Sequence, residues 1–225
     1  MVISAANMAL VAVVALLYAY NTLSVVETCL GFLLVLAIAV FLWFYRRGSS
    51  RRSNSSRIHR AIWIGFILGL LWVVEISINN FIAPPLPARD IIDNVFWAAI
   101  ALAIFIFASI CAYQTDSIVR GIEAGAWSGL ASGSVACGMA LSIIVFGMRY
   151  VTQDPLNVVE WAERASASIA PSMAAYFAFE TFAGAFGHLV VLGIVMGGLL
   201  GMMGGAMGKG TQRTARWIRK ARSIR

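Results

Sequence analysis

Polar side chains that are unfavourable in lipid share one face of a long apolar segment. Glu75 and Asn79 are four residues apart, and Trp72 lies one turn before Glu75. Residues three and four apart are neighbours on a helix surface, so these side chains form one patch, with Asn80 beside it. The carboxylate can act as a counter-ion or proton acceptor, the amides orient a ligand, and the indole provides an apolar wall. The pattern predicts a site that binds a ligand without covalent chemistry.

Two more ionisable residues lie in the last apolar stretch. Glu180 comes two turns before His188, which opens the final predicted span. Helix rise, about 1.5 Å per residue, places Glu75 and His188 in the outer half of the bilayer. Because ionisable groups are costly within spans, we expect Glu180 and His188 to join Glu75 in one outer-leaflet site. The alternative is that each side chain only snorkels or caps a helix near the interface.

A serine among small residues raises the alternative of an intramembrane enzyme. Leu130-Ala131-Ser132-Gly133 resembles the GxSG motif of rhomboid intramembrane proteases, a resemblance that implies a dyad of Ser132 with His188. The sequence departs from that family, because Leu130 replaces the leading glycine and the WR-type loop is absent. Helix rise puts Ser132 roughly 18 Å and His188 roughly 30 Å above the inner ends of their spans. A dyad requires hydrogen-bond contact, so we predict no catalytic residue.

Glycine recurs at four-residue spacing in two apolar segments. Four residues return to nearly the same helix face, so each series forms a groove into which another backbone can pack closely. We expect the two series to pack against each other within the chain. The alternative is that the last span uses its groove to dock another membrane protein or a second copy. The series are Gly193, Gly197, Gly201 and Gly205 in the last span, and Gly125, Gly129 and Gly133 in the fifth.

The composition places these residues in a membrane protein. Hydrophobic residues make up 60% of the 225 residues and charged residues 12%, against roughly 25% charged in a soluble domain. Most apolar residues fall in runs near the roughly 20 residues that cross a bilayer. This excludes a water-soluble domain, a disordered chain and a secreted disulfide scaffold. The three cysteines lie in apolar runs without CxxC spacing, so we predict no metal site and no cofactor.

Two basic segments determine the predicted topology. The loop 46–60 holds six arginines, and the tail 209–225 holds seven lysines and arginines. Basic segments beside spans stay cytoplasmic, so an even number of spans with both termini cytoplasmic accommodates both. The predicted fold is all-α, a single membrane domain over 1–225 with six transmembrane helices packed through glycines. The spans are expected at about 2–20, 26–45, 61–82, 94–113, 121–149 and 187–208.

Two connections leave alternatives open. Polar residues at 21–24 favour a tight hairpin over one long helix, because they would otherwise lie at mid-membrane. Residues 150–186 are expected to form an outer loop with a surface helix around 156–168. Within that loop, 171–186 is an interfacial helix, a re-entrant helix or, with a turn at 184–187, a seventh span.

The basic tail indicates contact with lipid. Its apolar stripe, surrounded by arginines, is typical of a helix that lies on the anionic inner leaflet of a membrane. The bilayer is therefore the predicted partner, and nucleic acid is not. The residues expected at the lipid surface are Arg213, Arg216, Trp217, Arg219 and Lys220.

These patterns favour a small multi-pass protein of the cell membrane, of transport or ligand-binding type. Its six predicted helices and the spacing Ala5-x3-Ala9 resemble, in outline, the substrate-binding S subunits of energy-coupling-factor transporters. No residue role follows from that resemblance. The alternative is a non-catalytic structural or assembly subunit of a larger membrane complex, with contacts through the last span and the tail. A rhomboid-like serine protease is the third alternative.

Overall fold

The computed structural model describes residues 2–48 and 52–222, and the described chain is helical throughout with no strand. Arg51 of the predicted basic loop and residues 223–225 of the predicted tail lie outside this range. Three segments, η1 to η3, are π-helices, which are wound more widely than α-helices. The elements are α1 (Val2–Tyr18), α2 (Thr22–Gly48), α3 (Arg52–Ser77), η1 (Ile78–Ile82), α4 (Leu86–Thr115), α5 (Ile118–Ser142), η2 (Ile143–Gly147), α6 (Met148–Gln153), α7 (Pro155–Arg164), α8 (Met173–Gly187), η3 (His188–Met196) and α9 (Gly197–Arg222).

Five helical segments of the described chain are long and apolar enough to cross a membrane. The predicted all-helical fold is therefore confirmed, and the length and apolar composition of these helices indicate a membrane protein. The first helix, Val2–Tyr18, is apolar but has only 17 residues, so length supports five of the six predicted spans. The five segments are Leu23–Trp43, Ser56–Ile82, Leu86–Thr115, Ile118–Gln153 and Met173–Arg222.

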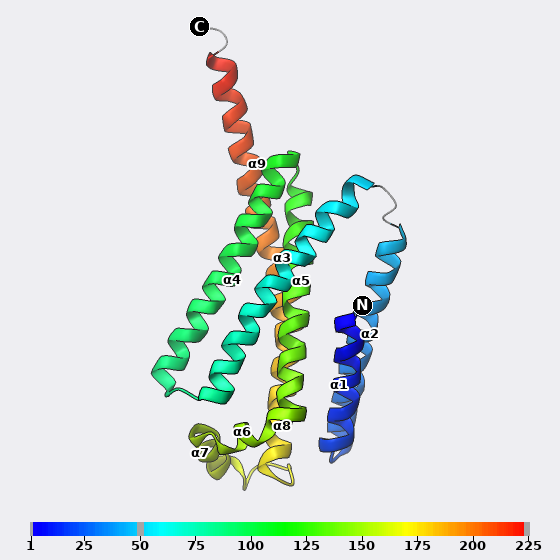
Figure 1. The fold of residues 1–225 in the computed structure, drawn as a ribbon, viewed down its shortest axis with the longest axis vertical. Coiled ribbons are helices and arrows are strands. Elements are labelled where there is room, and N and C mark those ends of the chain that lie inside the picture. The colour runs from blue at the N-terminus through cyan, green and yellow to red at the C-terminus, as the bar shows by residue number, and fades with distance from the viewer. Residues whose placement is uncertain (1, 49–51, 223–225) are drawn as a thin grey trace.

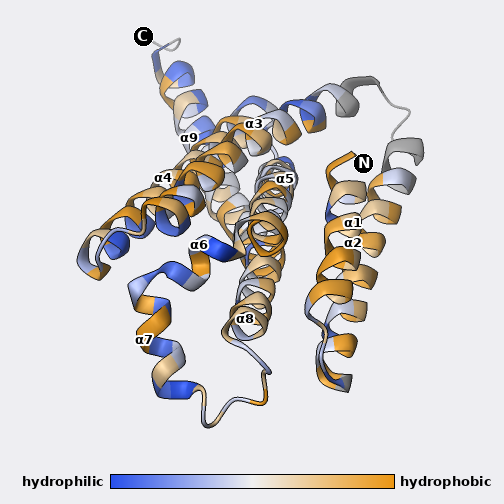
Figure 2. Ribbon diagram, turned by 60° about the horizontal axis from the view of Figure 1, so that its bottom comes forward, coloured by the Kyte–Doolittle hydropathy of each residue, from blue (hydrophilic) through white to orange (hydrophobic). Residues whose placement is uncertain are grey.

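Helix α5 lies at the centre of the molecule. It contacts α3, α4, α9 and α8, and the α1–α2 hairpin packs beside it (Figures 1 and 2). Its buried residues are mostly glycine, alanine and serine, whereas large apolar side chains such as Leu102 and Ile106 of α4 are exposed. Small residues between helices and large apolar residues outside are typical of helices that pack within lipid.

The α1–α2 connection is a tight turn, as the polar residues there predict. Asn21 caps α2, because its Oδ1 accepts a hydrogen bond from the Ser24 backbone N–H at 2.8 Å. The Ser24 Oγ in turn accepts from the Asn21 N–H at 3.1 Å, so the exchange is reciprocal. Asn7 of α1 is buried and donates from Nδ2 to the backbone oxygen of Ser134 at 3.0 Å. This bond ties the first hairpin to α5.

Elements α8, η3 and α9 form one continuous helical segment of 50 residues, Met173–Arg222. The structure thus differs from the prediction of a separate surface or re-entrant helix over 171–186. It differs equally from a seventh span with a turn at 184–187, because Gly184 and Gly187 lie within α8 and no described glycine has a positive φ. Glycine lowers helix propensity but does not end a helix when the backbone stays right-handed.

The two ends of the bundle differ in composition. The start of α3 and the C-terminal part of α9, both rich in arginine, lie at the same end (Figure 1). The α1–α2 and α3–α4 turns, with α6 and α7, lie at the other end, which we call the α7 end. Helix α7 ends at Arg164, so it is shorter than the predicted 156–168 helix.

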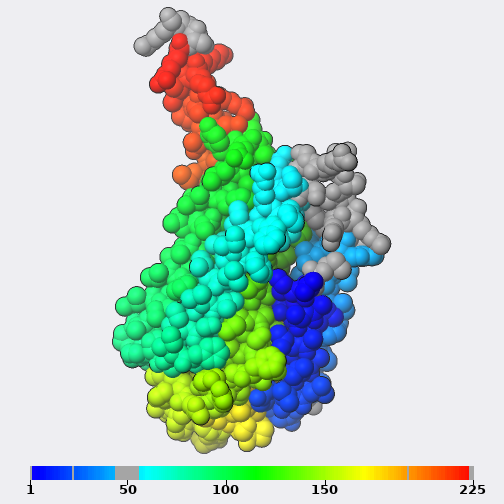
Figure 3. Space-filling model, in the orientation of Figure 1, coloured from blue at the N-terminus to red at the C-terminus, as the bar shows by residue number. Residues whose placement is uncertain are grey.

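The basic tail continues α9 and projects beyond the other helices (Figures 1 and 3). We expected a separate helix along the membrane surface, whereas in the structure α9 runs without a break from Gly197 to Arg222. Arg216 pairs with Asp116 of the α4–α5 turn at 2.9 Å. The basic residues of the tail therefore lie around the C-terminal end of α9, beyond the other helices, rather than on a separate surface helix.

The glycine series of α5 and of the last helix face each other. A Cβ on Gly121 would lie 2.5 Å from the Gly205 Cα, and one on Gly197 would lie 2.8 Å from the Gly125 carbonyl oxygen. Real Cβ atoms essentially never approach other atoms under 3.0 Å, so larger side chains would force these backbones apart. A Cβ on Gly125, Gly129 or Gly133 would likewise meet backbone atoms of the last helical segment. These atoms belong to Gly197, Gly193, Gly201, His188 and Leu189.

Candidate functional site

The α3–α4 hairpin brings the predicted site together near the α7 end. Helix α3 widens into η1, which ends at Ala83 with a left-handed backbone, φ 50°, and Pro84 and Pro85 follow. Proline cannot continue a helix, so the chain reverses before α4 starts at Leu86. The last turns of α3 and η1 therefore lie beside the first turns of α4.

Asn79 joins two carboxylates across this hairpin. Its Nδ2 donates to the Glu75 Oε1 at 2.7 Å and to the Asp93 Oδ1 at 2.6 Å. We call Glu75, Asn79 and Asp93 the acidic cluster. Glu75 is only 6% exposed, although it lies in a candidate span. The cluster therefore holds two carboxylates in a region where lipid solvates charge poorly.

Two oxygens of the acidic cluster are buried without a partner. They are the Glu75 Oε2 and the Asn79 Oδ1. Within residues 2–48 and 52–222, no lysine, arginine or histidine nitrogen lies within 4.0 Å of either carboxylate. A buried acceptor without a donor is unfavourable, so an additional donor or a positive charge would stabilise the cluster.

Aromatic rings form a layer beside the acidic cluster, one helical turn further from the α3–α4 connection than Glu75 and Asp93. The Trp72 ring packs edge-to-face against Trp97 of α4 and against His188, with centroid distances of 5.2 Å in both pairs. The His188 Nδ1 lies 2.8 Å from the Gly184 carbonyl oxygen, an arrangement in which Nδ1 is the donor. Each arm of the hairpin thus supplies one carboxylate and one tryptophan.

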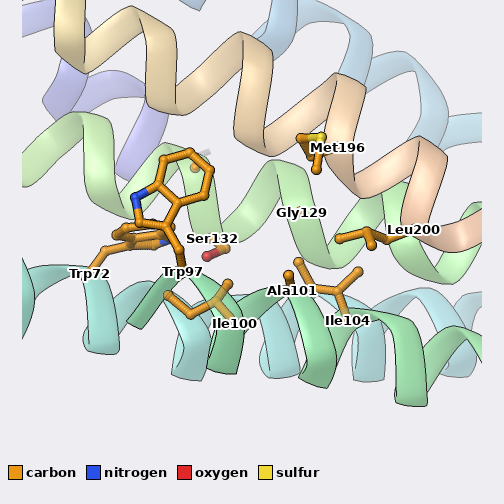
Figure 4. A pocket seen from close by; sticks show the side chains of 10 residues that line it. Trp72, Trp97, Ile100, Ala101, Ile104, Gly129, Ser132, Met196 and Leu200 are labelled. Carbon is orange, nitrogen blue, oxygen red and sulfur yellow. The ribbon is translucent and has the colours of Figure 1, made fainter. Parts of the chain in front are cut away.

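A small pocket lies beyond the aromatic layer (Figure 4). Its volume is about 30 Å³, enough for one or two water molecules. Trp72, Trp97 and Ser132 line it, together with small and aliphatic residues of α4, α5 and the last helix. The buried Ser132 Oγ has no hydrogen-bond partner, whereas Ser128 and Ser134 bond carbonyls of their own helix. A bound water would satisfy the Ser132 hydroxyl.

The structure separates two predicted site residues from the acidic cluster. Asn80 donates from Nδ2 to the Ile76 carbonyl oxygen at 2.8 Å, so it serves its own helix. Glu180 is 45% exposed and accepts a hydrogen bond from the Tyr176 hydroxyl at 2.8 Å. Its predicted place in the site is wrong, because α8 continues into η3 and carries Glu180 two turns further toward the α7 end than His188.

Glu180 belongs to an exposed group at the α7 end. The Tyr176 hydroxyl oxygen also lies 3.0 Å from the Glu160 Oε1, so the two carboxylates share its single proton, and Arg164 pairs with Glu160 at 3.4 Å and with Glu180 at 3.9 Å. The hydrogen bond from Arg164 to Tyr176, together with the nearby Glu160 charge, raises the pKa of the Arg164 guanidinium. The group holds α7 against the start of α8 and leaves no acceptor buried.

Asp93 is the site residue that sequence reasoning missed. It lies just before the fourth predicted span, which was expected to begin at about residue 94. The available signal was its spacing: Asp93 and Trp97 are four residues apart, as close on a helix as Trp72 and Glu75. Helix α4 starts at Leu86, eight residues before the predicted span, and this places Asp93 on a helix.

Ser132 and His188 lie at nearly the same level, contrary to the separation that helix rise predicted. A Cβ on Gly133, next to Ser132, would lie 2.6 Å from the His188 backbone oxygen. The count assumed an α-helix from His188 to the inner end of the last span, whereas His188–Met196 form the π-helix η3. The Ser132 Oγ nevertheless has no hydrogen-bond partner, so the two side chains form no dyad in this structure.

Compared with known proteins, the chain matches no family model, no curated protein and no solved structure. The fold therefore defines only a class, a helical membrane protein with five helices of spanning length in its described part. No group of three or more histidine, cysteine, aspartate or glutamate side chains that could hold a metal occurs among the described residues. The acidic cluster, with two carboxylates and an amide, is the distinctive polar feature of the spans.

Proposed function

We propose that this protein binds and transports a small ligand at the acidic cluster, in the outer leaflet of the cell membrane. The proposal depends on one observation, the Asn79 amide that bridges Glu75 and Asp93 inside a candidate span. The contacts of α3 with α5 do not involve this cluster, because they are made at Gly65 and Gly69. Two carboxylates at such a position are unfavourable unless they hold something.

Each residue of the site has a role in binding. Glu75 acts as counter-ion to the ligand, and Asn79 orients it through its amide. Trp72 closes the site on the side of the pocket, where it contacts Trp97 and His188. The pocket beside Ser132 is the next compartment along the helix axes, so movement of the Trp72–Trp97 pair would connect the two.

The proposed topology has six spans with both termini in the cytoplasm. The arginine-rich ends of α3 and α9 lie at one end of the bundle, which is then the cytoplasmic end. Helix α1 is the sixth span; its 17 residues rise roughly 25 Å, and α2 pairs with it in a hairpin. The facing glycines of α5 and of the last helix hold the transport bundle together.

A second candidate function is that of an assembly subunit, which the projecting end of α9 favours. The glycine face of the last helix is occupied by α5 within the chain, so a partner would bind the projecting end instead. Trp217 there is 72% exposed among basic residues. Arg213, Arg216, Arg219 and Lys220 would meet anionic headgroups or an acidic partner at the cytoplasmic surface.

Mass spectrometry of what co-purifies with the protein tests the proposed function. Full-length protein in mild detergent should carry a small molecule or ion that Glu75→Gln loses. Asp90→Asn is the matched control, since Asp90 is an exposed carboxylate one turn before Asp93 on the same helix. Retention of the ligand by Glu75→Gln would contradict the proposal. Recovery of a stoichiometric protein partner and no small ligand would favour the assembly subunit.

A further inference from the structure

We infer that the acidic cluster binds a monovalent metal cation of about the size of sodium, held entirely by oxygen atoms. This inference rests on the proposed function, because it names the ligand class of the same site. Glu75 and Asp93 both accept hydrogen bonds from the single nitrogen of Asn79, so their oxygens converge on one point. A positive ion at that point would relieve their mutual repulsion.

The unpaired oxygens point independently to an ion. Glu75 is more than nine-tenths buried, and its Oε2 has no donor. The Asn79 Oδ1 is likewise buried without a donor, one turn along the same helix. Both atoms are acceptors, and with Asp93 they provide carboxylate and amide oxygens. Hard cations prefer such oxygen ligands.

The Asn79 amide occupies the place of the cation in the present structure. Its Nδ2 protons carry partial positive charge toward both carboxylates. A half-turn of the amide exchanges nitrogen and oxygen, which are the same size. The Oδ1 would then face the carboxylates and complete a set of three protein oxygens around the ion. Binding would thus replace two hydrogen bonds with three ligand bonds, and the Asn79 Nδ2 would take the place that its unpartnered Oδ1 occupies now.

Other occupants fit the cluster less well. An organic ammonium ion needs a cavity, but the nearby pocket lies beyond Trp72 and is lined by neither carboxylate. Calcium takes six to eight oxygens and magnesium loses its water reluctantly, whereas the cluster offers two carboxylates and one amide. A single proton would satisfy one carboxylate oxygen and would leave the Asn79 Oδ1 without a donor.

Thermal unfolding of the full-length protein in detergent tests the inference. Sodium chloride is titrated against N-methylglucamine chloride at constant ionic strength and pH. A ligand that binds only the native state raises Tm in a saturable manner, so Tm should rise with sodium. Glu75→Gln and Asp93→Asn should each weaken the apparent sodium affinity by about tenfold or more, as loss of groups at metal sites does. Asp90→Asn should respond like the wild type.

Substitution of Asn79 separates ion binding from a structural role. Asn79→Asp keeps an oxygen ligand but cannot donate, so it should be unstable without sodium and should regain stability as sodium is added. Asn79→Leu has neither property and should not respond to sodium. A purely structural hydrogen bond would make both variants unstable at every sodium concentration, a result that overturns the inference.

The remaining outcomes distinguish failure of the inference from failure of the proposed function. A wild-type Tm that does not change with sodium overturns the cation inference. A Tm that rises only with magnesium or calcium, or only with acid, overturns it too. If Glu75→Gln still loses a co-purified ligand in any of these cases, the proposed function stands. If Glu75→Gln changes neither the ligand nor the sodium response, both are overturned.

Discussion

Asn79 and Asp93, on opposite arms of the α3–α4 hairpin, are joined by a hydrogen bond of 2.6 Å from the Asn79 Nδ2 to the Asp93 Oδ1. The same nitrogen binds Glu75 on its own arm at 2.7 Å. One amide therefore connects the two arms and separates two carboxylates. It follows that the stability of the hairpin and the binding capacity of the site depend on the same side chain.

Replacement of Asn79 should expose the repulsion between the two carboxylates. In the absence of sodium, Asn79→Leu should lower the free energy of unfolding by about 2–3 kcal/mol, because Glu75 and Asp93 lose a shared donor. Adding Glu75→Gln to this variant should restore part of the loss, since one charge is removed. Denaturant unfolding in detergent measures both. Additive losses in the double variant would show that the carboxylates do not interact.

Adjacent glycines of the last helix should respond in opposite ways to alanine. A Cβ on Gly197 would meet the Gly125 oxygen at 2.8 Å, whereas one on Gly198 would meet nothing within 4 Å. Gly197→Ala should therefore destabilise the protein by about 1–3 kcal/mol. Gly198→Ala should be neutral or stabilise it by up to about 1 kcal/mol, because alanine restricts the unfolded chain. Equal Tm shifts in the two variants would contradict close packing of α5 against the last helix.

The buried pair of Arg89 and Asp154 should hold the α7 end together. Its atoms lie 2.5 Å apart, and Asp154 also caps α7 through a bond from the Leu156 N–H. Asp154→Ala removes both interactions and should cost about 3 kcal/mol. Asp154→Asn keeps the cap and should cost less. In the alanine variant, amide hydrogen exchange should become faster in α7 and stay slow in the bundle. An unchanged exchange rate in α7 would contradict this role.

Ser132 should be dispensable for stability and should not act as a nucleophile. Its Oγ is buried without a partner, so Ser132→Ala should be neutral or should stabilise the protein by up to about 1 kcal/mol. A fluorophosphonate probe, which labels activated serines, should leave wild-type Ser132 unmodified. Covalent labelling that Ser132→Ala abolishes would instead indicate a serine hydrolase with His188 as its base.

The all-helical fold with long apolar segments could be predicted from the sequence, because the length of an apolar run has a direct physical cause. Glu75 and Asn79 could be paired from spacing alone, since a helix fixes neighbours four residues apart. Contacts between helices could not be predicted in the same way. Asp93 joins the cluster only because α4 begins at Leu86, immediately after two prolines, and continues through the charged residues Arg89 and Asp90.

The level of His188 shows a second limit of sequence reasoning. The last span was expected to begin at about residue 187, and the level of His188 was counted from the inner end of that span. Whether glycine ends a helix depends on the packing around it, and here the helix continues into η3. In the structure His188 contacts Trp72, and Glu180 bonds Tyr176 outside the site. The tail orientation was missed for the same reason, because no residue pattern marks where the long helix would bend.

An experimental density map of the full-length protein in sodium chloride tests the central claim most directly. The account predicts density for a non-protein species within coordination distance of both Glu75 and Asp93, with the Asn79 carbonyl turned toward it. Carboxylates that face acyl chains or bulk water, with nothing bound between them at a resolution that shows ordered ions, would contradict it.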